Sequence, residues 1–197
     1  MKKASLGFVA AALFATGIAF GSEWDVDASH SRVGFSVRHM MVSNVKGSFT
    51  KYTGALNLDD KDVTKSTLNV DIDAASVQTG DEKRDAHLKS PDFFDVARFP
   101  KLTFVSKKVE KRGDGGLNVT GDLTIHGVTK STVLGVQPLS NEYKDPWGGT
   151  HRGTTAIAKI NRKDFGLTWN KGLEAGGVLV GEEVSIELEI ELIPKKK

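Results

Sequence analysis

The feature that most constrains this chain is a period of two in its apolar residues. The clearest run lies at residues 184–192, where five apolar side chains alternate with Ser185 and three glutamates. Such alternation is typical of β-strands with one buried and one solvated face, and it favours antiparallel pairing. The same period recurs at residues 32–38, 67–74, 117–125 and 154–160. Weaker signals at residues 47–58, 102–109 and 128–139 bring the predicted set to about eight strands.

An all-β chain with about eight such strands has two common architectures, a closed barrel and a two-sheet sandwich. Alternation by itself favours the barrel only slightly. Strands of about ten residues would be roughly 33 Å long, and an eight-stranded barrel has room for side chains or one small ligand. We therefore predict an extended eight-stranded antiparallel barrel, with one or two short helices.

Two stretches interrupt the strand pattern and are predicted to be helical. Residues 79–90 begin with Thr79 and Glu82, which fit a capping box, and they end before Pro91. A second short helical turn is predicted after Arg38, through residues 39–41.

The N-terminus has the pattern of a secretory signal peptide. Two lysines precede an uncharged run of about 15 residues, which ends in the small-x-small sequence Ala19-Phe20-Gly21. The alternative is a membrane anchor, but a spanning helix needs about 20 apolar residues. We predict a signal peptide at residues 1–21 and one domain at residues 22–197, with cleavage after Gly21 or, as second choice, after Ala19. The expected location is the periplasm, without stable membrane insertion.

Charge and composition exclude several classes of function. Without Lys2 and Lys3, the chain would carry equal numbers of acidic and basic residues, so no basic surplus indicates nucleic-acid binding. The chain has no cysteine, which excludes disulfides, thiolate catalysis and iron–sulfur clusters. We predict no cofactor.

Alternation also identifies the side chains that would face the barrel interior. The predicted lining residues are Val33, Phe35, Val37, Leu68, Val70, Ile72, Phe104, Leu123, Ile125, Ala156, Ala158, Ile186 and Leu188. The pattern does not separate a filled core from a lined tunnel, although the two alanines hint at free space. In a tunnel, these side chains would bind an apolar tail, since each buried methylene contributes about 0.8 kcal/mol.

Five other residues are candidates for contacts with a polar head group at a barrel mouth. Guanidinium groups suit bidentate contacts with oxygen atoms, which points to Arg38, Arg84 and Arg162. Trp147 and Trp169 lie in glycine-rich loops that are placed to close over a ligand. The alternatives are surface ion pairs for the arginines and ordinary loop packing for the tryptophans.

The most enzyme-like cluster is Arg84-Asp85-Ala86-His87. In a catalytic interpretation, Asp85 would orient His87 as a general base. In a structural interpretation, which we favour, the charged side chains attach the helix to the barrel. The five histidines show none of the ligand spacings of known metal motifs, so we predict no metal site, although barrel ends can gather distant loops.

A string of motifs, in this order and spacing, resembles one protein family. The motifs are Asp27-Ala28-Ser29-His30-Ser31, Val33-Gly34-Phe35-Ser36-Val37-Arg38-His39, Lys46-Gly47-Ser48-Phe49, Arg84-Asp85-Ala86-His87-Leu88, Ser90-Pro91-Asp92-Phe93-Phe94-Asp95, Phe99-Pro100-Lys101-Leu102-Thr103-Phe104, Gly121-Asp122-Leu123-Thr124-Ile125-His126-Gly127-Val128-Thr129 and Asn161-Arg162-Lys163-Asp164-Phe165-Gly166. Together they resemble the YceI-like family, across nearly the whole predicted mature chain.

The resemblance implies a lipocalin-like barrel that binds a polyisoprenoid, quinone-like or prenyl-phosphate-like, in its interior. It also implies a periplasmic homodimer, and it carries over no catalytic residues. We therefore expect a lipid carrier or sequestering protein that is not an enzyme. Two alternatives stay open: an enzyme that acts on such a lipid through His87 and Asp85, and a stress-related or partner-binding barrel with a filled core.

Overall fold

The alternating sequence folds into strands along most of its length. Residues 21–174 and 176–196 are described by a computed structural model, in which they form twelve β-strands, one α-helix and three 3-10 helices. The strands are β1 (Gly21–Val26), β2 (Arg32–His39), β3 (Ser43–Phe49), β4 (Tyr52–Asp59), β5 (Thr67–Asp73), β6 (Val77–Gln78), β7 (Lys101–Lys111), β8 (Leu117–Ile125), β9 (Val128–Val136), β10 (Tyr143–Lys144), β11 (Thr150–Asn161) and β12 (Val180–Pro194). The helices are η1 (Val63–Lys65), η2 (Ala74–Ser76), α1 (Glu82–Lys89) and η3 (Arg162–Phe165).

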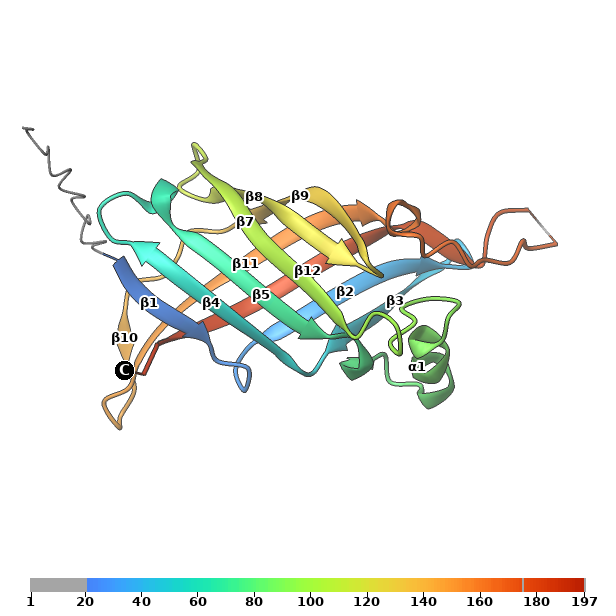
Figure 1. Cartoon of the computed structure of the whole chain (residues 1–197), viewed down its shortest axis with the longest axis horizontal. Helices are drawn as coiled ribbons and strands as arrows, with labels where there is room; N and C mark the ends of the chain where they lie inside the picture. The colour runs from blue at the N-terminus through green and yellow to red at the C-terminus, as the bar shows by residue number, and fades with distance from the viewer. Residues whose placement is uncertain (1–20, 175, 197) are drawn as a thin grey trace, which may run out of the picture.

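Eight of these strands close into an antiparallel barrel, which confirms the predicted architecture. The order around the barrel is β11, β9, β8, β7, β5, β4, β1 and β12, and β12 pairs back with β11. One edge of β12 pairs with two strands: residues 192–194 pair with β1, and residues 180–189 pair with β2. Strands β2, β3 and β6 therefore extend the sheet beyond the closed barrel. The barrel is elongated, with α1 at one end and β10 at the other (Figure 1).

The predicted long strand at residues 47–58 is in fact two strands, β3 and β4. The break falls at Thr50 and Lys51, whose backbone N–H groups donate to the carbonyl and the hydroxyl of Ser76, at 3.2 and 3.1 Å. These contacts replace the pairing of a continuous strand. The short strands β1, β6 and β10 were not predicted, because each is too short or too close to the chain start to show alternation.

The helix begins later than predicted, and the proposed capping box is wrong. Asp81 is the N-cap of α1, and its carboxylate accepts the Arg84 N–H at 2.9 Å. Thr79 instead donates its hydroxyl to Asp85 at 2.6 Å. The second predicted helical turn is also wrong: Met40 and Met41 have positive φ angles of 49° and 63° and form the tight turn between β2 and β3.

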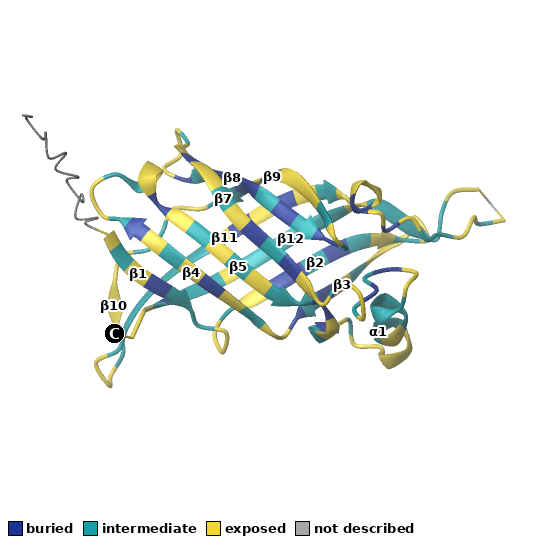
Figure 2. Ribbon diagram, in the orientation of Figure 1, coloured by how far each residue is buried: buried dark blue, intermediate teal, exposed yellow. Residues whose placement is uncertain are grey.

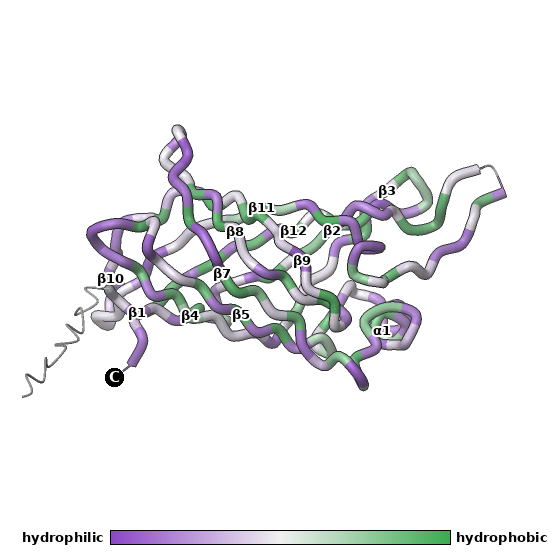
Figure 3. Tube along the Cα trace, turned by 45° about the horizontal axis from the view of Figure 1, so that its top comes forward, coloured by the Kyte–Doolittle hydropathy of each residue, from purple (hydrophilic) through white to green (hydrophobic). Residues whose placement is uncertain are grey.

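Buried and exposed residues alternate along the strands, as do apolar and polar ones (Figures 2 and 3). The main hydrophobic cluster fills the middle of the barrel and the end covered by α1. A second cluster around Trp24, Leu58 and Leu192 packs where β1, β4 and β12 meet. Among the described residues, no helix is long and apolar enough to cross a membrane. The predicted signal peptide falls on residues 1–20, outside the described range, apart from Gly21, which begins β1.

Candidate functional site

The barrel interior contains a cavity of about 310 Å³. Its walls are almost entirely aliphatic and aromatic side chains, contributed by strands around the whole barrel. The lining runs from Leu58 and Leu192, near the β10 end, to Phe93 and Leu167, near the α1 end. A volume near 300 Å³ lies at the lower limit for small-molecule pockets, and an apolar wall selects an apolar guest. The hydrophobic cluster therefore encloses free apolar space and does not fill the barrel completely.

Twelve of the thirteen residues predicted to face inward line this cavity. The exception is Ala158, which is buried in the main hydrophobic cluster but does not reach the cavity. Ala156 has the same side chain and does line the cavity, so the difference between the two alanines comes from their places along β11 and not from side-chain length. Whether the twelve residues contact a ligand stays a prediction.

The aromatic residues Phe93 and Phe94 line the α1 end of the cavity, although no strand pattern indicated them. They lie in the turn after α1, where the Phe94 N–H donates to the Leu88 carbonyl at 2.9 Å. The apolar pair in Ser90-Pro91-Asp92-Phe93-Phe94 was the only available signal. Its inward direction depends on how α1 packs on the barrel, which local sequence does not specify.

Arg162 is the one charged residue among the described residues that line the cavity. Its side chain is only 5% exposed. The guanidinium donates to three backbone carbonyls: Nε to Gly181 at 2.8 Å, one terminal nitrogen to Val180 at 3.3 Å, and the other to Leu167. Burial lowers the pKa of this guanidinium, and the charge of Glu182 opposes the shift. Arginine has five N–H donors and stays protonated in proteins, so the three bonds to carbonyls leave two further donors on this guanidinium. The cavity wall is almost entirely apolar, so Arg162 lines it mainly through the carbon atoms of its side chain.

Local sequence explains how Arg162 reaches this position. Asn161 caps η3 by accepting the Lys163 N–H at 2.9 Å, and Gly166 ends η3 with a φ of 79°. This short helix turns both Arg162 and Phe165 inward, where both are buried. Opposite them, the pairing of β12 with β2 is irregular between Val180 and Val184, which leaves carbonyls in that stretch to accept from the guanidinium.

Comparison with known proteins identifies the family. The YceI-like domain model matches residues 24–192, almost the whole described chain. The chain belongs to the YceI-like family. Protein YceI of Salmonella newport (strain SL254) is 38% identical over 199 residues, and the match covers 100% of both chains.

Solved structures show the same YceI-like fold. The YCEI protein of Campylobacter jejuni has a TM-score of 0.68 and 34% sequence identity, covering 86% of this chain and 96% of that one. A polyisoprenoid binding domain from Saccharophagus degradans, implicated in plant cell wall breakdown, has a TM-score of 0.63 and covers 87% of this chain and 98% of that one. At 18% identity, the second likeness concerns the fold alone.

Two of the three candidate arginines lie away from the cavity of this YceI-like barrel. Arg38 is exposed and donates to the Met41 carbonyl at 2.8 Å, so it braces the β2–β3 turn. Arg84 donates to the Thr79 hydroxyl and carbonyl, at 2.7 and 3.0 Å, so it ties α1 to the segment before it. Neither side chain lines the cavity, and contact of either with a head group stays a prediction.

The two candidate tryptophans have different surroundings: Trp147 is exposed, and Trp169 packs against other aromatic rings. Trp147 is 89% exposed in the turn between β10 and β11, at the end of the barrel opposite α1, and it covers no cavity mouth. Trp169 packs edge-on against His87, with ring centroids 4.7 Å apart, and against Phe93 at 5.3 Å. It therefore supports the cavity wall from behind Phe93 and does not line the cavity itself.

The catalytic interpretation of His87 required Asp85 as its partner, and the structure pairs His87 with Asp92 instead. His87 Nε2 lies 2.8 Å from Asp92 Oδ2, while Asp85 accepts the Thr79 hydroxyl. The imidazole also packs edge-on against Phe93. The charged side chains therefore tie α1 to the segments on either side of it, and the ring contact of His87 with Trp169 is what links the cluster to the segment after η3.

Proposed function

We propose that this protein binds one long-chain isoprenoid lipid inside its barrel and carries or sequesters it, without chemical turnover. The observation that carries the proposal is the apolar cavity, whose lining extends from one end of the barrel to the other. A saturated or prenyl tail offers no polar atoms, and its burial contributes about 0.8 kcal/mol for each methylene equivalent. The polyisoprenoid binding of the Saccharophagus degradans domain supports an isoprenoid as the lipid class.

We further propose that a polar or anionic head group lies at the α1 end, against Arg162. The two unused N–H donors of its guanidinium suit oxygen atoms of a quinone-like or prenyl-phosphate-like head. The opposite end of the cavity is lined by uncharged polar residues, among them Ser66, Gln137 and Thr154, beside the Trp24 cluster. Arg162, the one charged residue in the described lining, therefore makes the two ends of the cavity different.

The test is mass spectrometry of organic extracts from natively purified protein. We expect one isoprenoid lipid for each protein chain. Repeated preparations without lipid, together with no uptake of an added prenyl phosphate or quinone, would contradict the proposal. In that case the cavity would be a packing feature of a barrel that acts through its surface.

Export is part of the proposal and rests on the predicted signal peptide. N-terminal sequencing of protein from the periplasmic fraction should find Ser22 as the first residue, or Phe20 if cleavage follows Ala19. Protein that keeps Met1 and stays with the cytoplasmic fraction would contradict it. The homodimer implied by the resemblance also stays a prediction, which sedimentation equilibrium tests directly.

A further inference from the structure

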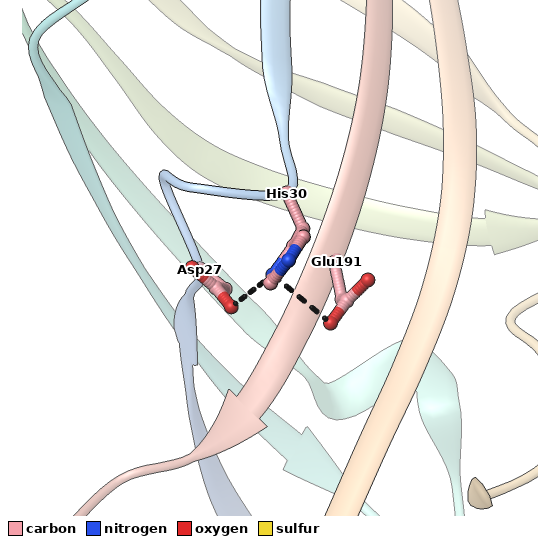
Figure 4. Close-up of side chains that lie close together, drawn as sticks. All are labelled: Asp27, His30 and Glu191. Atoms are coloured by element: carbon pink, nitrogen blue, oxygen red, sulfur yellow. Dashed lines mark hydrogen bonds and ion pairs between the residues drawn. The ribbon is translucent and has the colours of Figure 1, made fainter. Parts of the chain in front are cut away.

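Five metal-ligating side chains from three separate segments converge on the outer surface of the barrel. Asp27 and His30 lie in the turn between β1 and β2, Glu191 lies on β12, and Asp145 and His151 lie around the β10–β11 turn. Glu191 follows Ile190, which lines the cavity, so strand alternation directs Glu191 outward. Figure 4 shows Asp27, His30 and Glu191 pointing toward one another.

The distances within this cluster are close to those of a metal coordination shell. His30 Nδ1 lies 2.9 Å from Asp27 Oδ2 and 3.7 Å from Glu191 Oε1. One donor atom from each of these residues lies within 4.8 Å of the others. His151 adds a second imidazole, with its Nδ1 2.7 Å from Glu191 Oε1. Ligands of a tetrahedral ion, at about 2.0–2.2 Å from it, are separated by about 3.3–3.6 Å, which these spacings bracket.

A second layer of contacts holds the donor atoms in place. Asp145 Oδ2 lies 3.0 Å from His151 Nε2, which leaves Nδ1 directed at Glu191. Asp145 is fixed in turn by the N–H groups of Trp147 and Gly149, each at 2.8 Å. A carboxylate behind the imidazole is the usual support of a histidine that binds a metal.

A surface hollow gives solvent and ions access to the cluster. His30, His151 and Glu191 line it together with uncharged polar residues such as Ser140 and Gln137. Its volume of about 620 Å³ leaves ample room for an ion with bound water. This hollow is an observation separate from the spacing of the donor atoms, and it places them at an accessible surface.

We propose that Asp27, His30 and Glu191 bind one divalent transition-metal ion, with water completing the shell and with His151 and Asp145 as positioning residues around Glu191. An imidazole and two carboxylates suit zinc and its neighbours better than Mg²⁺ or Ca²⁺, and the two carboxylates balance the charge of the ion. Sequence spacing predicted no metal site, because the three segments meet only in the folded barrel. This proposal is independent of the lipid.

Metal binding at this cluster should be linked to protons. An imidazole must be neutral to bind a metal, and Asp27 and Glu191 lie beside the His30 ring at 2.9 and 3.7 Å. A metal ion would compete with protons for this imidazole, so its binding should release protons to the buffer.

The experiment is calorimetric titration of Zn²⁺ into protein that carries no histidine tag, produced from the full chain. We expect one site with a Kd of about 10 µM or tighter. His30→Ala and His151→Ala should each weaken binding about 100-fold, and Asp145→Asn about ten-fold. The matched control is His39→Ala, at the far end of β2, which should bind as the unchanged protein does. Thermal unfolding without metal checks that each variant is folded.

Further measurements distinguish coordination from loose attraction to surface carboxylates. Heats measured in buffers of different ionisation enthalpy should reveal proton release, and bound Co²⁺ should show the intense visible absorption of four-coordinate sites. If a histidine variant fails to fold, Asp27→Asn and Glu191→Gln replace it, because both keep the size of the side chain. The proposal is overturned by the absence of saturable binding, by equal affinity for Mg²⁺, or by binding that survives the loss of both histidines.

Discussion

Ile190 and Glu191 are neighbours on β12, yet they belong to two different environments. Ile190 lines the apolar cavity, whereas Glu191 lies on the outer surface between two histidines. The residues of the inner face can be identified from local sequence, since every second residue of a strand points inward. The outer cluster has no local signature and exists only because closure brings β1, β11 and β12 together. The cavity lining can therefore be predicted from the sequence, whereas the outer cluster can be found only in the folded structure.

The strongest test of this difference blocks the inner face and leaves the outer face unchanged. Ala156 lines the cavity, and the next residue, Ile157, is 62% exposed. Ala156→Phe adds a ring inside a cavity of about 310 Å³, so we expect loss of most of the bound lipid. Ile157→Phe should retain lipid at the unchanged level. Quantitative mass spectrometry of extracts measures both.

Overpacking would also destabilise the fold, by about 1–3 kcal/mol if the ring does not enter the cavity. Thermal unfolding of Ala156→Phe separates the two effects. Equal lipid content in the two phenylalanine variants would show that the cavity is not the binding site.

The second test compares a buried arginine with an exposed one. Arg162→Met removes the donors from three carbonyls, one buried and two part-buried, and we expect the free energy of unfolding to fall by about 3–5 kcal/mol. Arg38→Met removes contacts at the surface and should change it by about 0.5 kcal/mol or less. Urea unfolding measures both values. A loss in Arg162→Met no larger than that in Arg38→Met would contradict the structural role of the buried charge.

Head-group binding at Arg162 requires a separate measurement, because this variant is also expected to be less stable. Arg162→Lys keeps the charge and loses the fork of donors. If the guanidinium contacts the head group, the lysine variant should bind a prenyl phosphate more weakly while its affinity for a prenyl alcohol stays near the original value. Equal losses for the two ligands would place the head group elsewhere.

The barrel and most of its inner wall were predictable because they depend on a repeated local pattern. Seven of the eight barrel strands and twelve of the thirteen proposed lining residues follow from alternation, whereas β1 was not predicted. The choice of the barrel over the sandwich followed from the resemblance. The candidate head-group residues were chosen by chemical type alone. Arg162 lines the cavity because η3 turns inward, whereas Arg38 and Arg84 make local contacts within their own turns. Only tertiary structure separates these cases.

The third test repeats the inner and outer comparison on β8, at the level of stability. Leu123 is buried and lines the cavity, while Thr124 shares a hydroxyl hydrogen bond of 2.8 Å with Thr129 on the outer face. We expect Leu123→Ala to lower the free energy of unfolding by about 2–4 kcal/mol, and Thr124→Ala by about 0.5–1 kcal/mol. Urea denaturation with equal m-values for both variants makes the comparison valid. Equal losses would contradict the assignment of the two faces.

The smallest expected effect is a pH dependence that belongs to the outer cluster. The carboxylates around His30 and His151 raise the pKa of both imidazoles above 6.5, the ordinary value in the unfolded chain. Their contribution to stability is therefore complete below about pH 6.5 and is lost as the pH rises through the raised values. In the presence of a chelator, the protein should therefore lose stability as the pH rises above about 6.5, and it should lose more than the double variant His30→Gln/His151→Gln does.

With zinc bound, the stability of the protein should rise with pH instead of falling. Metal binding needs neutral imidazoles, so zinc affinity, and with it the stabilisation by zinc, should rise over the same pH range. Thermal unfolding across that range, with chelator and with saturating Zn²⁺, measures both slopes on one sample. The double variant keeps the other three histidines, so the difference between the two proteins isolates His30 and His151. If stability changed with pH in the same way with and without zinc, the metal proposal would be contradicted. The two histidines would then only form ion pairs that link β1, β11 and β12.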